Sequence, residues 1–124
     1  MNLLIVDDSK AMRMIVRRTL RQAGYEEVTI TEAGNGVEAL AAINQATPDL
    51  ILSDWNMPEM MGIDLLRKLK ETKCPSAFGF VTSESTEEMR MTAMEAGALF
   101  LITKPFTPES FKAALDPVVG GALA

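Results

Sequence analysis

Short apolar runs alternate along this chain with stretches in which apolar residues recur at helical spacing. The runs cover residues 3–6, 28–31, 50–53, 78–82 and 99–103. Several of them are continuously apolar rather than alternating, which is typical of parallel strands that are covered on both faces. We therefore predict five buried strands.

The stretches between the runs have the period and the end signals of helices. They cover residues 10–23, 37–44, 63–69, 85–96 and 107–115. Gly24 and Gly97 stand where a C-terminal cap glycine belongs. Residues 85–88 read Ser-Thr-Glu-Glu, a capping box that opens the fourth helix, and Thr107 with Pro108 opens the fifth.

Five strands that alternate with five helices predict an α/β fold. Right-handed crossovers put helices on both faces, so we expect a flavodoxin-like (βα)5 fold with a doubly wound, five-stranded parallel sheet of order 2-1-3-4-5. The chain shows no repeat, linker or low-complexity segment, and residues 1–124 are interpreted as one domain. Gly79 does not fit this interpretation, because a glycine inside a central strand should weaken the packing of that strand.

Composition excludes several classes of function. A net charge of −5 argues against nonspecific binding to nucleic acid. Histidine is absent, which excludes Ser-His-Asp and Cys-His catalysis and every imidazole metal site. Cys74 is the only cysteine, so no internal disulfide can form. No apolar run reaches membrane-spanning length and no signal peptide precedes the first strand, so we expect a soluble, cytoplasmic protein.

Polar side chains with useful chemistry follow four of the five predicted strands. They are Asp7 and Asp8 after the first strand, Asp54 after the third, Thr82 after the fourth and Lys104 after the fifth. Each alone is an ordinary turn or cap residue. Because ligands of a doubly wound sheet bind outside the carboxyl ends of its strands, however, their coincidence predicts a shared site.

The residue types in this set suit phosphoryl transfer. Three nearby carboxylates repel one another unless a cation neutralises them, and Mg²⁺ prefers carboxylates together with phosphate and water. The ammonium of Lys104 and the hydroxyl of Thr82 could each contact a phosphoryl oxygen. Asp54 would then be the nucleophile that forms an acyl phosphate.

Five segments around these positions match the motifs of one family. They are residues 6–9, 33–40, 53–58, 81–84 and 103–106. On these segments the chain, over about residues 2–119, resembles a response regulator receiver domain of two-component signalling, and it is similar to the chemotaxis type. The resemblance implies a switch that accepts a phosphoryl group from a phosphohistidine on a histidine kinase or a histidine phosphotransfer protein. It would catalyse only its own phosphorylation and dephosphorylation.

The resemblance also implies a role for each site residue. Asp54 is the phosphoacceptor, and Mg²⁺ is held by Asp7, Asp8, Asp54 and the backbone carbonyl of Asn56. Asn56 and Glu84 occupy the positions that tune dephosphorylation, and their identities suggest a short-lived phosphoryl group.

The resemblance assigns a further set of roles near the fourth and fifth strands. Thr82 is the switch hydroxyl, Lys104 contacts the phosphoryl group, and the peptide bond between Lys104 and Pro105 is cis. The family usually has an aromatic switch residue three positions before the lysine, but this chain has Leu101. Phe100 is adjacent, yet alternation along a strand points it to the opposite face.

Arg13, Arg17 and Arg21 are spaced four apart and predict one exposed basic stripe on the first helix. The stripe is either a solvated face or a docking site for an acidic kinase or phosphotransfer partner.

Several functional alternatives remain open. The chain could be a stand-alone monomeric regulator of a downstream target protein, the excised receiver of a larger regulator, or a phosphorelay intermediate or phosphate sink. An aspartyl-phosphate phosphatase is disfavoured, because it needs a second carboxylate where this chain has Asn56. A flavin-binding module is also disfavoured, because Asp7 and Asp8 would repel its phosphate.

Overall fold

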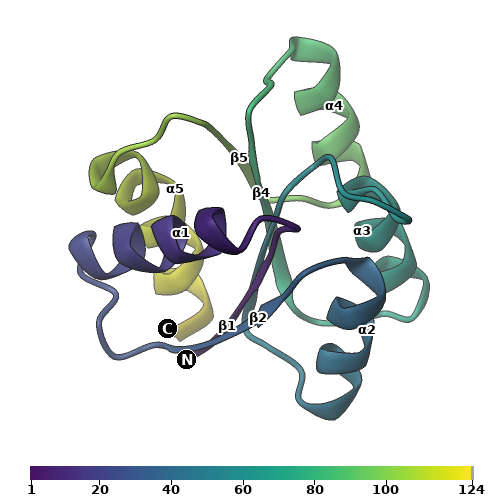
Figure 1. The fold of residues 1–124 in the computed structure, drawn as a ribbon, viewed down its shortest axis with the longest axis horizontal. Helices are drawn as coiled ribbons and strands as arrows, with labels where there is room; N and C mark the ends of the chain where they lie inside the picture. The colour runs from purple at the N-terminus through teal and green to yellow at the C-terminus, as the bar shows by residue number, and fades with distance from the viewer. Residues whose placement is uncertain (124) are drawn as a thin grey trace.

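The computed structural model describes residues 1–123 and contains five strands that alternate with five helices (Figure 1). In chain order they are β1 (Asn2–Val6), α1 (Lys10–Gln22), β2 (Thr29–Ala33), α2 (Gly36–Gln45), β3 (Leu50–Ser53), α3 (Gly62–Glu71), β4 (Ala77–Thr82), α4 (Glu87–Ala96), β5 (Phe100–Thr103) and α5 (Pro108–Leu123). The predicted alternation is confirmed. Ala124 and the side chains of residues 120–123 lie outside the described part.

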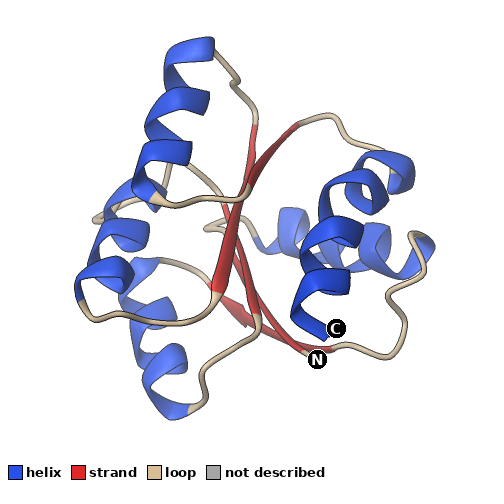
Figure 2. Cartoon of the chain, turned by 180° about the vertical axis from the view of Figure 1, so that it is seen from behind, coloured by secondary structure: helices blue, strands red, loops and turns tan. Residues whose placement is uncertain are grey.

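All five strands form one parallel sheet of order β2-β1-β3-β4-β5, which confirms the predicted flavodoxin-like order. Helices α1 and α5 cover one face, and α2, α3 and α4 cover the other (Figures 1 and 2). Side chains of β1 alternate between the two layers. Leu3 and Ile5 pack toward α1 and α5, whereas Leu4 and Val6 pack toward the other three helices. None of the helices in residues 1–123 is long and apolar enough to cross a membrane.

Several predicted boundaries differ from the structure. The fifth helix, predicted to end at Leu115, continues to Leu123, and two further differences have a clear physical cause. The second strand was predicted to end at Thr31, but β2 continues to Ala33, which pairs with Val6 at the end of β1. As an edge strand, β2 keeps exposed polar side chains that an apolar pattern does not detect. The fourth helix is capped by Thr86 rather than Ser85, because the Thr86 hydroxyl accepts a hydrogen bond from the amide of Met89.

The predicted opening of α5 is confirmed by its end contacts. The Ser110 amide donates to Thr107 Oγ1 at 3.1 Å, and the Thr107 amide donates to Ser110 Oγ at 2.9 Å. Each hydroxyl therefore accepts a hydrogen bond from the backbone amide of the other residue at the start of the helix, which begins at Pro108.

Gly79 does not leave a gap in the packing of the sheet. Gly79 lies opposite Phe100 in the pairing of β4 with β5. The ring of Phe100 occupies the space that a Cβ on Gly79 would need. The missing side chain is thus replaced by an aromatic ring from the neighbouring strand, an arrangement that compensates for a glycine in a sheet.

Candidate functional site

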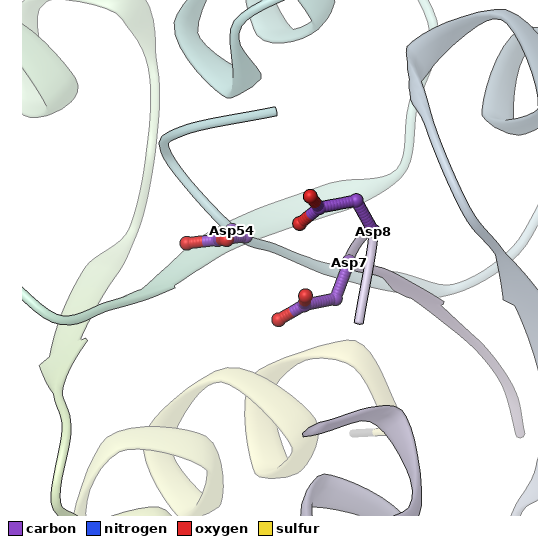
Figure 3. Close-up of side chains that lie close together, drawn as sticks. All are labelled: Asp7, Asp8 and Asp54. Carbon is purple, nitrogen blue, oxygen red and sulfur yellow. The ribbon is translucent and has the colours of Figure 1, made fainter. Parts of the chain in front are cut away.

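Three carboxylates converge at the carboxyl edge of the sheet (Figure 3). Asp7 and Asp8 follow β1, and Asp54 follows β3. Val6 pairs with Ser53 at the ends of these adjacent strands, so the residues that follow lie side by side. One carboxylate oxygen from each aspartate lies within 4.8 Å of the others, a separation that one metal ion can bridge. The predicted meeting of these three residues is confirmed.

Local hydrogen bonds hold Asp7 in place. Its amide donates to the Ala33 carbonyl at 3.1 Å, which extends the pairing of β1 with β2 by one bond. Its Oδ1 accepts from the Ser9 amide at 2.9 Å, and Ser9 in turn caps α1. The chain therefore turns from strand to helix with the Asp7 carboxylate fixed and nearly buried.

Asp54 is held by its own loop. The Trp55 amide donates to Asp54 Oδ1 at 2.8 Å, and Ser53 Oγ donates to the Asp54 carbonyl at 2.9 Å. The start of α3 lies against the same carbonyl, because a Cβ on Gly62 would collide with it. Gly62 is therefore required for the close approach of α3 to the Asp54 backbone.

Lys104 reaches the carboxylates from the end of β5. Its Nζ lies 3.4 Å from Asp7 Oδ2 and 3.7 Å from Asp54 Oδ1. Its amide donates to the Thr82 carbonyl at 2.7 Å, which ties the ends of β4 and β5 together. The peptide bond between Lys104 and Pro105 is cis, as the resemblance implied.

Negative charge is not fully compensated at this cluster. Burial raises the pKa of the Asp54 carboxyl, and the charges of Asp7 and Asp8 raise it further. The Lys104 ammonium and the Trp55 amide lower the pKa of the same group but do not cancel the rise. The site therefore favours an additional cation. Its donor set consists of hard carboxylate oxygens, which fit Mg²⁺.

The remaining predicted site residues lie around this cluster. Thr82 is fully buried at the end of β4, and its Oγ1 is 3.4 Å from the Glu84 amide. Glu84 and Asn56 are both exposed, each two residues beyond a predicted functional residue. The roles of Asn56 and Glu84, including metal binding by the Asn56 carbonyl, remain predictions.

Leu101 and Phe100 face opposite sides of the sheet. Leu101 is 7% exposed and packs in the layer of α2, α3 and α4, whereas Phe100 packs toward α1 and α5. The sequence-based expectation that Phe100 cannot stand in for an aromatic residue at position 101 is therefore confirmed.

The prediction that Arg13, Arg17 and Arg21 form one exposed basic stripe is wrong for part of the stripe. The Arg13 side chain is only 17% exposed, and its Nε lies 2.9 Å from Glu32 Oε1. Arg17 Nη2 lies 2.9 Å from Glu32 Oε2. Burial raises the pKa of Glu32, but hydrogen bonds and charge from Arg17 and Arg13 outweigh this and leave it below its usual value. Arg21 stays exposed.

Glu32 is a residue that the sequence analysis missed. We considered the ends of four strands but not the end of the second, whose predicted boundary stopped at Thr31. A rule that searched the end of every strand would have found Glu32. The contact of Arg13 with Asp7 was also missed: Arg13 Nη1 donates to the Asp7 carbonyl at 2.6 Å.

Comparisons with known proteins agree with this geometry. A family model described as "Response regulator receiver domain" matches residues 3–116. The chain is 41% identical to chemotaxis protein CheY1 of Helicobacter pylori, covering 97% of this chain and 98% of the relative. It is 39% identical to a CheY homolog of Campylobacter jejuni, covering 97% and 93%.

Solved structures show the same relationship. The structure of chemotaxis protein CheY4 from Vibrio cholerae superposes with a TM-score of 0.83 at 33% identity, covering 94% of this chain and 97% of that one. The fold, the sequence similarity and the acidic cluster therefore all indicate the same family. The chain belongs to the response regulator receiver domain family, and within it to the receiver domains of CheY-like chemotaxis regulators.

Proposed function

We propose that this chain accepts a phosphoryl group on Asp54 from a phosphohistidine of a histidine kinase or histidine phosphotransfer protein in the cytoplasm. The convergence of Asp7, Asp8 and Asp54 with the ammonium of Lys104 carries the proposal. Asp7, Asp8, Asp54 and the Asn56 carbonyl would hold Mg²⁺, which supplies positive charge to the transferring phosphoryl oxygens.

The transfer needs little chemistry beyond positioning. A carboxylate oxygen of Asp54 forms a bond to phosphorus while the bond from phosphorus to the donor imidazole nitrogen breaks. The imidazole leaves with the electron pair of that bond. Lys104, which bridges Asp7 and Asp54 in the described structure, would pair with a phosphoryl oxygen, and the Thr82 hydroxyl would donate to another. The product is an acyl phosphate on Asp54.

The same site would remove the group again. Asn56 and Glu84 are exposed beside the site, where they can influence how a water molecule approaches the acyl phosphate. We propose that they give the short lifetime that the family resemblance suggests.

Docking of the phosphodonor is proposed on the outer face of α1. Met14, Arg17, Arg18 and Arg21 line a shallow hollow of about 190 Å³ there. Met14 is 55% exposed, so the hollow combines one apolar side chain with three arginines. Such a surface fits an acidic helical partner. Arg17 and Arg21 of the predicted stripe line this hollow, and Arg13 does not. Arg17 also pairs with Glu32.

The test is phosphorylation with acetyl phosphate and Mg²⁺, read by intact mass. Wild type gains one phosphoryl group, and Asp54→Asn does not. Asp64→Asn is the matched control, because Asp64 is an exposed aspartate of α3 outside the acidic cluster and should leave the gain unchanged. Equal phosphate gain by Asp54→Asn would refute the assignment.

A phosphorelay intermediate or phosphate sink is a second candidate, favoured by the buried Leu101 in place of an aromatic switch residue. The two functions differ in where the phosphoryl group goes. A relay protein returns phosphate from Asp54 to a histidine phosphotransfer protein, whereas an output regulator binds a target protein more tightly when phosphorylated. Phosphate transfer and target binding, measured on the same phosphorylated sample, separate them.

A further inference from the structure

The Arg13 guanidinium connects three parts of the carboxyl edge. It extends from α1, donates to the Asp7 carbonyl at 2.6 Å and to Glu32 of β2 at 2.9 Å. It is also near the loop that opens α2, since its Nη1 would lie 3.7 Å from a Cβ on Gly34. The guanidinium therefore fills the corner between the acidic cluster and the edge strand.

The Asp7 carbonyl is a sensitive position for the site. It belongs to the peptide that joins Asp7 to Asp8, and it lies beyond the last pair of the β1–β2 ladder, Val6 with Ala33. The orientation of this peptide sets the directions in which the two neighbouring carboxylates project. A hydrogen bond from a charged donor to this carbonyl therefore fixes the relative positions of two proposed metal ligands.

Glu32 in turn fixes the guanidinium. Its two oxygens accept separately from Arg13 and Arg17, both at 2.9 Å, so the carboxylate lies between two side chains of α1 that are one turn apart. Arg13 is thus held at two points, at Glu32 and at the Asp7 carbonyl. The planar fork of arginine makes this double contact possible, and a lysine ammonium does not reproduce it.

We infer that Arg13, clamped by Glu32, is a positioning residue that preorganises the Asp7–Asp8 turn for cation binding. The inference rests on the proposed function, since it concerns the same metal site. Groups that orient metal ligands through hydrogen bonds typically change metal affinity by about 10- to 100-fold when removed. Arg13 acts through a ligand's backbone, so we expect an effect at the lower end of this range.

If Arg13 acted through its charge alone, its removal would have the opposite effect on Mg²⁺ affinity. Removing a cation beside an acidic cluster reduces its repulsion of Mg²⁺ and should tighten binding. Loss of positioning weakens binding instead. The sign of the effect of Arg13→Gln therefore separates the two explanations.

The experiment is a Mg²⁺ titration without phosphodonor, followed by isothermal calorimetry and by the fluorescence of Trp55. We expect Arg13→Gln to weaken Mg²⁺ binding about tenfold and Arg13→Lys, which keeps the charge but not the fork, about threefold. Arg90→Gln is the matched control, an exposed arginine of α4 without an ion pair in the described residues. Unchanged or tighter binding by Arg13→Gln, or an equal loss in Arg90→Gln, would overturn the inference.

A second readout needs no metal. In EDTA, the Ser9 amide, which donates to Asp7 Oδ1, should exchange its hydrogen several times faster in Arg13→Gln than in Arg90→Gln. Glu32→Gln should loosen the same amide, and the double variant should add little to either single change. Equal exchange in all variants contradicts the inference. A wild type that fails to bind Mg²⁺ refutes the proposed metal site instead, and the exchange data still decide the role of Arg13.

Discussion

At the scale of a single residue, the proposed role of Asp54 as phosphoacceptor sets two requirements that oppose each other. A nucleophilic carboxylate has to be ionised, yet its side chain is only 13% exposed and lies beside two further carboxylates. Burial and these neighbours raise its pKa, and Lys104 offsets only part of the rise. The charged form of Asp54 therefore destabilises the metal-free fold while it prepares the site for a cation.

Removing that charge should stabilise the protein. In EDTA at about pH 7, we expect Asp54→Asn to melt about 4 °C higher than wild type, which corresponds to roughly 1 kcal/mol in a domain of this size. A carboxyl with a raised native pKa contributes stability below its unfolded pKa and loses it as pH rises through the native value. The difference between the two proteins should therefore shrink as the pH falls toward about 4. Thermal unfolding followed by circular dichroism across this range measures it.

Asp64→Asn serves as the control here as well, since its carboxylate is about half exposed. It should melt within about 1 °C of wild type. If Asp54→Asn melts below wild type in EDTA, or if its advantage grows as the pH falls, the account of Asp54 is wrong.

The main residues of the site could be predicted because topology decides their meeting. Asp7, Asp54 and Lys104 stand at strand ends, and parallel strands bring those ends to one edge whatever the side chains do. The clamp of Arg13 by Glu32 could not be predicted in the same way. It depends on how far a long side chain reaches toward an edge strand, and no periodic pattern encodes that distance.

At the scale of elements, α1 and α5 pack on the same face of the sheet (Figure 1). A polar contact joins the loop that follows α1 to α5. The Tyr25 hydroxyl, just after α1, donates to Asp116 of α5. Asp116 also pairs with Lys112 one turn earlier at 3.0 Å. Burial, followed by the hydrogen bond and charge of Asp116, raises the pKa of Tyr25 above its usual value.

This contact predicts a loss of stability in alkali. Above about pH 10 the unfolded chain releases the Tyr25 proton while the native protein keeps it, so stability falls as the pH rises. Tyr25→Phe should lower the melting temperature at neutral pH by about 2 °C, because an exposed hydrogen bond contributes little. It should also flatten the alkaline decline.

Tyr25 is the only tyrosine, so the ultraviolet absorbance of tyrosinate reports its ionisation directly. A midpoint at or below pH 10.0 in the native protein would contradict the assignment. Asp116→Asn should move the midpoint downward, and Asp64→Asn, on α3 at the opposite face of the sheet, should not.

Strands and helices could be predicted to the extent that their patterns are local. The four strongly apolar strands, β1, β3, β4 and β5, were found close to their true bounds. The edge strand β2 was cut short because it exposes the polar residues Thr31 and Glu32. The packing of the Phe100 ring beside Gly79 could not be predicted either. It depends on the register between β4 and β5, which no local sequence pattern gives.

At the scale of the whole molecule, the proposed metal site and Lys104 join elements from both halves of the sheet. Asp7 and Asp8 follow β1, Asp54 follows β3, and Lys104 follows β5. The unfolded chain separates these residues, so a cation that bridges the carboxylates binds only the native state. Binding of Mg²⁺ should therefore stabilise the entire fold through linkage.

The size of that stabilisation is a prediction for the whole chain. At a Mg²⁺ concentration about 100 times the dissociation constant, unfolding should cost about 2.7 kcal/mol more, which raises the melting temperature by about 10 °C. Asp8→Asn removes an exposed proposed ligand with little risk to folding, and it should lose most of this increase. Asp64→Asn should keep all of it. An increase of the same size in Asp8→Asn would place the stabilising ion elsewhere, because a bridging site cannot lose one of its three carboxylates without losing affinity.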